Sequence, residues 1–140
     1  MLQCSNGNWV AGFARKLGTM SSTMAELWAL KDGLSLAKQL NLHNINIELD
    51  AEFLMRLLSN PTTINLMLEP LLNDCRTLIR SMPNCSVTHI FREVNRCMDR
   101  MAKMGANLAI DFLILYEPPP VVDNVLAFDK AELYCNRLFV

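Results

Sequence analysis

The chain has 140 residues, a formal net charge of −1 and a hydrophobic content of 51%. This length is typical of one domain and is enough to bury a full core. Because positive and negative charges nearly balance, the net charge of the protein cannot attract it to nucleic acid. Binding to a polyanion therefore needs a local basic patch or metal ions.

No segment of the sequence predicts contact with a membrane. The longest apolar stretch, Leu108–Tyr116, contains Asp111 and is far shorter than the roughly 20 residues of a spanning helix. The N-terminus has neither the positive start nor the apolar run of a signal peptide, so we expect an intracellular protein. The five cysteines are odd in number and lack CxxC spacing, which favours free thiols in a reducing compartment over a zinc site.

The first half of the chain predicts a strand, a long helix and a second strand. Apolar and small residues over Asn8–Arg15 follow an Asn-Gly turn and indicate a strand that leaves a hairpin. Helical spacing over Ser22–Leu40 predicts a helix, with Ser22 and Thr23 as candidate N-caps. Ile45–Asp50 alternates between apolar and polar residues, as a strand with one buried face does.

The second half predicts further helices around one more strand. A short helix is expected over Ala51–Leu58, a longer one over Ile64–Arg80, and a second alternating strand over Ser86–Phe91. Asn95 is expected to cap a helix that runs to about Asn107. Three consecutive prolines follow at 118–120, after which we expect a peripheral tail. This order indicates an α/β domain with at least one parallel pair of strands.

Three acidic residues occupy positions from which they can reach one place. Asp50 closes a predicted strand, Glu26 lies early in the helix before it, and Asp99 lies in the helix after the last strand. Carboxylates at such positions hold hard divalent cations, and two ions roughly 4 Å apart can cleave a phosphodiester. Each also has a purely structural interpretation: Glu26 in a capping box with Thr23, Asp50 as a helix cap, and Asp99 as a favourable charge near a helix N-terminus.

Other polar residues surround Asp99 in the sequence. His89 lies on the last predicted strand, where it could be structural or could carry a proton beside a metal site. A basic stripe follows at near-helical spacing and could be either a solvated face or a surface for phosphate. The stripe consists of Arg92, Arg96, Arg100 and Lys103.

Several blocks in the right order resemble the plant ribonuclease H-like domain related to retrotransposon reverse transcriptases. The blocks are Asn6–Phe13 (NGNWVAGF), Leu17–Gly18, Ala25–Leu30 (AELWAL), Ile47–Ala51 (IELDA), His89–Ala102 (HIFREVNRCMDRMA) and the tail around Leu126–Asp129. In place of IELDA the family usually has a Glu-x-Asp-Ser motif. The long block is similar to its His-x-x-Arg-Glu-x-Asn-x-x-Ala-Asp-x-Leu-Ala pattern. The resemblance implies a ribonuclease H-like mixed sheet flanked by helices.

The resemblance also implies an activity and a site. The family hydrolyses the RNA strand of RNA–DNA hybrids with two Mg²⁺ ions, for which Mn²⁺ can substitute. Glu26, Asp50 and Asp99 match three of its metal-binding carboxylates, and His89 matches a histidine that assists product release or proton transfer. Asn95 matches a polar residue near the substrate backbone. The further candidates for contact with nucleic acid are Arg92, Arg96 and Arg100.

One departure from the family pattern affects the expected activity. In the family a first, central strand carries an Asp-Gly pair, and its Asp lies between the two metals. The sequence begins at the end of the family's second strand. We therefore expect a truncated domain over residues 1–116, a tail over 117–140, and little or no hydrolysis. The alternatives are an active nuclease whose first strand lies upstream, and a non-catalytic nucleic-acid-binding or interaction remnant of a retroelement-derived protein.

The missing strand also leads to an expectation for the sheet. In the family it pairs with both the hairpin and the strand matched by Ile45–Asp50. We expect either a gap between these two or a direct new pairing, with a poorly anchored N-terminal segment. Apolar surface left uncovered in this way predicts self-association.

Overall fold

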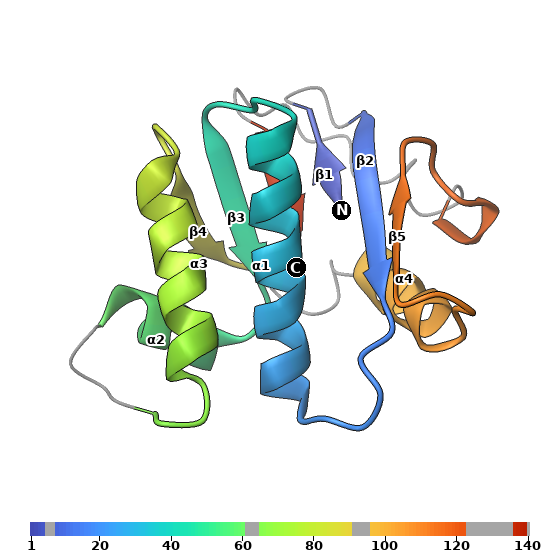
Figure 1. Cartoon of the computed structure of the whole chain (residues 1–140). Coiled ribbons are helices and arrows are strands. Elements are labelled where there is room, and N and C mark those ends of the chain that lie inside the picture. Colours follow the sequence, from blue (N-terminus) through green and yellow to red (C-terminus); the bar gives the residue numbers. More distant parts are fainter. Residues whose placement is uncertain (5–7, 61–64, 91–95, 123–135, 140) are drawn as a thin grey trace.

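The computed structural model describes residues 1–4, 8–60, 65–90, 96–122 and 136–139. These residues form a mixed sheet with helices on both faces (Figure 1). The strands are β1 (Leu2–Gln3), β2 (Trp9–Arg15), β3 (Ile45–Leu49), β4 (Ser86–His89), β5 (Phe112–Leu115) and β6 (Asn136–Phe139). The helices are α1 (Ser22–Gln39), α2 (Glu52–Ser59), α3 (Glu69–Ser81) and α4 (Arg96–Ala106). The predicted mixed α/β fold is therefore confirmed.

The strands lie in the order β4-β3-β6-β1-β2-β5. β3 pairs in parallel with β4 and with β6, whereas β1 is antiparallel to both β6 and β2. The expected parallel pair formed by β3 and β4 is present. β5 runs antiparallel to β2 at the opposite edge of the sheet and was not predicted from the sequence.

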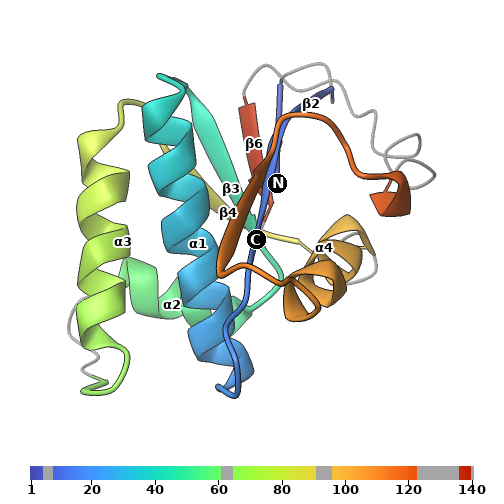
Figure 2. The ribbon, with the colours of Figure 1, turned by 45° about the vertical axis from the view of Figure 1, so that its right-hand side comes forward.

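Two helices cover one face of the sheet and a third packs on the other (Figure 2). α1 and α3 enclose the main core, in which four apolar residues at helical spacing on α1 are buried: Leu27, Leu30, Leu34 and Ala37. On the opposite face, α4 contacts β2 so closely that a Cβ atom on Gly105 would lie 3.1 Å from the carbonyl oxygen of Arg15. A second apolar cluster forms there from Met1, Cys97, Met101 and Val122.

The expectation of either a gap in the sheet or a direct new pairing is wrong. β6 fills the position between β1 and β3, so the two strands neither face a gap nor pair with each other. Its Leu138 is fully buried and lies against α1, where a Cβ atom on Gly33 would come within 2.5 Å of a Leu138 methyl group. Interior strands bond on both sides, so the four residues of β6 satisfy backbone groups on β1 and β3 that would otherwise be unpaired.

Two related expectations also change. The N-terminal segment is well anchored, because Met1, Leu2 and Gln3 are all buried. The tail is not wholly peripheral, since its last described strand is central to the sheet. The division at residues 116 and 117 stays a prediction, because residues 123–135 lie outside the described part. Self-association also stays a prediction.

The cap of α1 and the start of α3 differ from the sequence pattern. α1 is capped by Ser21, whose Oγ accepts a hydrogen bond of 3.2 Å from the Met24 amide, and not by Ser22 or Thr23. α3 begins at Glu69, five residues later than expected, because the Asn65 side chain accepts bonds from the Met67 and Leu68 amides and holds a turn there.

Four cysteines, at positions 4, 75, 85 and 97, are free thiols, as expected, and Cys135 lies outside the described residues. Burial raises the pKa of the Cys75 thiol to about 12, so this group is unreactive at neutral pH. None of the described helices is long and apolar enough to cross a membrane.

Replacing Leu138 with Ala should lower the free energy of unfolding by roughly 3 kcal/mol, because it removes a fully buried side chain and leaves a cavity in the core. Leu66→Ala is the matched control. Leu66 is 86% exposed, and we expect its change to stay within about 0.5 kcal/mol. Urea denaturation followed by circular dichroism measures both. Equal effects of the two substitutions would show that β6 does not pack in the sheet.

Candidate functional site

A cleft of about 660 Å³ opens where β2 and β3 end. Its walls are the loop after β2, the first half of α1, the residues after β3, and the face of α4 turned toward the sheet. Ligand sites in α/β proteins commonly lie beyond the carboxyl ends of parallel strands, and Asp50 directly follows β3. The fold therefore places a hollow at the edge where the sequence predicted a site.

All three predicted carboxylate residues line this cleft. Glu26 comes from α1, Asp50 from the end of β3 and Asp99 from the first turn of α4. Glu26 and Asp50 are half-buried, and Asp99 is exposed. The structure thus brings together residues from three separate parts of the chain, but sharing a cleft does not by itself make them metal ligands.

Their arrangement does not form a ready-made ion site. Among the described residues, no three His, Cys, Asp or Glu side chains are grouped closely enough to hold a metal ion. Mg²⁺ requires near-octahedral oxygen ligands at 2.0–2.1 Å, and proteins usually supply only one or two carboxylates besides substrate phosphates. The three carboxylates as placed here do not fit a preformed pair of ions.

The structure rules out two of the three purely structural interpretations of these carboxylates. Because Ser21 caps α1, the capping box between Thr23 and Glu26 does not form. The N-cap of α2 is Ala51, which makes no side-chain cap bond, so Asp50 does not cap that helix. Asp99 does lie in the first turn of α4, where its charge is favourable, and it lines the cleft as well.

His89 lies at the end of β4, next to the cleft. Its register partner on β3 is Leu49, and its Nε2 lies 3.3 Å from the backbone oxygen of Asp50. A carbonyl oxygen only accepts, so this hydrogen bond forms when Nε2 carries the proton. The His89 side chain is exposed, but it does not itself line the cleft.

An ion pair that the sequence did not predict forms part of the cleft wall. Arg15 of β2 donates from Nε and Nη2 to the two carboxylate oxygens of Asp32 on α1, at 2.6 and 2.8 Å. Its guanidinium lies 5.0 Å from the ring centroid of Trp28 and 4.7 Å from that of Phe112. The hydrogen bonds to Asp32 raise the pKa of Arg15, so its guanidinium is charged at neutral pH.

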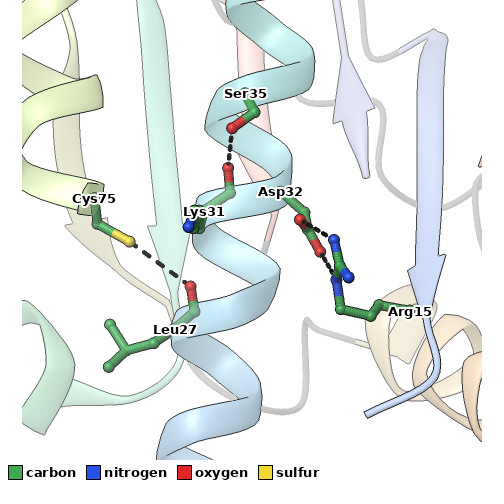
Figure 3. A network of polar contacts seen from close by, with 6 residues as sticks. All are labelled: Arg15, Leu27, Lys31, Asp32, Ser35 and Cys75. Atoms are coloured by element: carbon green, nitrogen blue, oxygen red, sulfur yellow. Dashed lines mark hydrogen bonds and ion pairs between the residues drawn. The ribbon is translucent and has the colours of Figure 1, made fainter. Parts of the chain in front are cut away.

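Figure 3 shows that α1 is held on both sides by polar contacts. Toward β2 it is held by the Arg15–Asp32 pair, and toward α3 by the Cys75 thiol, which donates to the Leu27 carbonyl oxygen at 3.7 Å. Lys31 adds an exposed ion pair of 2.8 Å to Asp74 of α3. These contacts fix the helix that carries Glu26.

The predicted basic stripe is only partly described. Arg92 and Asn95 lie outside the described residues, and the side chain of Arg96 is also outside them. Arg100 and Lys103 are exposed on α4, on the side away from the cleft. Cleft residues that the sequence analysis missed are Arg15, Lys16 and Asp32. No local spacing connects a strand residue with a helix residue, so only the fold could reveal the Arg15–Asp32 pair.

Asp32→Asn should lower the free energy of unfolding by about 2 kcal/mol, because it leaves the guanidinium of Arg15 without its bidentate partner in a largely buried place. Asp74→Asn breaks an ion pair whose carboxylate is 53% exposed and should cost less than about 1 kcal/mol. Urea denaturation of both variants provides the comparison. A loss for Asp32→Asn no larger than that for Asp74→Asn would contradict the structural importance of the pair.

Comparisons with known proteins agree with the fold. A family model described as reverse transcriptase-like matches residues 1–105, which include all three cleft carboxylates and His89. An Arabidopsis thaliana protein named "Putative ribonuclease H protein" is 26% identical over 129 residues, which are 92% of this chain. The chain spans only 21% of that relative's length. The match over most of the chain shows that the protein belongs to the reverse transcriptase-like family of ribonuclease H-like domains.

Proposed function

We propose that the domain binds nucleic acid along the cleft and that an RNA–DNA hybrid is its substrate class. The observation that carries the proposal is that Glu26, Asp50 and Asp99, from three distant parts of the chain, line one cleft. The family match and the name of the Arabidopsis relative support the same substrate class.

Hydrolysis of the RNA strand is the reaction that this family membership suggests. In the proposal, Glu26, Asp50 and Asp99 are the oxygen ligands available for Mg²⁺ or Mn²⁺, and a divalent cation would supply charge stabilisation at the phosphate. His89, exposed at the end of β4 and bonded to the Asp50 carbonyl, is the candidate proton carrier. Among the described residues, these carboxylates are not grouped as a preformed site for such an ion.

Binding without efficient cleavage is the form of this function that the geometry favours. Two like-charged ions close together need anionic ligands at short range to offset their repulsion. No three possible ligands are clustered among the described side chains. We therefore expect ions to bind mainly when substrate phosphates complete their coordination. A non-catalytic nucleic-acid-binding role is the second candidate, and the same observation favours it.

Contacts with the phosphate backbone must come from local cations, since the net charge is −1. Lys16 lies at the cleft and is exposed. The proposed further contacts are Asn95, Arg92, Arg96 and, for nucleic acid that extends past α4, Arg100. Each phosphate that Lys16 or one of these arginines neutralises should make the affinity depend more steeply on salt.

The free protein should bind Mg²⁺ only weakly, with a dissociation constant on the order of millimolar, because too few carboxylates are grouped for tight coordination. Isothermal titration calorimetry on the free protein measures this. Asp50→Asn should weaken what binding there is, whereas Asp74→Asn on α3 should leave it unchanged. Micromolar affinity in the free protein would show that the carboxylates do form a preformed site.

Purified protein should bind a labelled RNA–DNA hybrid and cleave it slowly or not at all in Mg²⁺ or Mn²⁺. Asp50→Asn should abolish any residual cleavage and leave binding intact or tighter, because it removes a negative charge that faces the phosphates. Fluorescence anisotropy and gel electrophoresis of the products provide the two readouts, with Asp74→Asn as control.

Two results would overturn different parts of the proposal. Failure of the wild-type chain to bind the hybrid at low salt would refute the substrate class. Rapid turnover that Asp50→Asn eliminates would show instead that the carboxylates suffice for catalysis as they stand.

A further inference from the structure

A second hollow lies on the other side of α4 from the cleft. It is open, has a volume of about 630 Å³ and involves residues of α4, of the turn after it and of the segment after β5. Its lining is Arg100, Lys103, Met104, Asn107, Leu108 and Val121. α4 therefore separates two hollows: Asp99 lines the cleft, and the next residue, Arg100, lines the second one.

The polar part of this second hollow is cationic. Arg100 and Lys103 are both exposed, and the lining contains no carboxylate among the described residues. Arg100 Nη1 donates to the Val121 carbonyl oxygen at 2.7 Å, which fixes the guanidinium while leaving its other N–H groups for a ligand. Asn107 Nδ2 donates to the Lys103 carbonyl oxygen at 3.0 Å, so its amide oxygen takes no part in that bond.

The rest of the lining is apolar. Met104 and Leu108 are half-buried, and Val121 is 46% exposed. Two cations beside an apolar surface match a nucleotide, with its anionic phosphate and flat base. The bases of a duplex are stacked on one another, so only an unpaired base can lie on such a surface.

We propose that this second hollow binds a single-stranded stretch of the nucleic acid whose paired part occupies the cleft. Phosphates contact Arg100 and Lys103, and an unpaired base lies on Met104, Leu108 and Val121. The inference rests on the proposed function, since it takes the cleft as the site of the paired region. It predicts a preference for hybrids that continue into a single strand over hybrids with blunt ends.

The experiment compares a blunt RNA–DNA hybrid with the same hybrid carrying a single-stranded extension of about six nucleotides. Fluorescence anisotropy is measured in EDTA, so that no cleavage occurs. The extension should tighten binding to the wild-type chain by about fivefold and steepen its salt dependence by about one unit. Lys103→Glu should remove both gains while changing the affinity for the blunt hybrid much less.

Arg80→Glu is the matched control, because Arg80 is exposed on α3 and the substitution changes the net charge equally. It should preserve the gain from the extension. Leu108→Ala should reduce the gain without altering the salt dependence, because it removes apolar contact and no charge. Circular dichroism establishes that each variant folds.

The outcomes separate this inference from the proposed function. If the blunt hybrid binds but the extension adds nothing, or if Lys103→Glu keeps the gain, the second hollow is not a nucleic-acid site and the cleft proposal stands. If the extended hybrid binds and the blunt hybrid does not, the second hollow is supported as a single-strand site and the cleft proposal fails. If neither nucleic acid binds, both are wrong.

Discussion

The pairing of β6 with both β1 and β3 is the constraint on which the rest of the structure depends. An interior strand forms backbone hydrogen bonds along both of its edges. The four residues of β6 pair with β1 on one side and with β3 on the other. Leu138 then joins the strand to α1 through the close approach at Gly33. Among the described strands, β6 is the one that joins the half of the sheet that carries Arg15 to the half that ends at Asp50.

The cleft depends on that link because its walls come from both halves of the sheet. Arg15 reaches it from β2, Asp50 from the end of β3, and α4 closes it by packing on the face opposite α1. The bidentate pair with Asp32 fixes α1, and hence Glu26, against β2. The result is a shared hollow in which the described carboxylates are not grouped closely enough for a preformed ion site. For this reason we propose nucleic-acid binding for the domain, and not efficient hydrolysis.

Local patterns predicted the elements whose side chains repeat regularly. The helical spacing of α1 and the alternation of β3 each reflect one buried face. The sequence blocks that resemble the family led to the carboxylates of the cleft. β5 escaped prediction because its four residues, Phe112–Leu115, are uniformly apolar and half-buried, so they show no alternation. β6 is equally short, and its central place is decided by long-range pairing. The Arg15–Asp32 pair likewise depends on how β2 packs against α1.

The central claim is that the cleft between β3, α1 and α4 receives the nucleic acid. Amide chemical shifts of ¹⁵N-labelled protein, titrated with a hybrid whose RNA strand is 2′-O-methylated against cleavage, test it most directly. The account predicts that the largest changes occur at Lys16, Gly18, Asp50 and Asp99, with little change along the outer face of α3. Changes confined to α3, or no changes at a saturating concentration of hybrid, would contradict it.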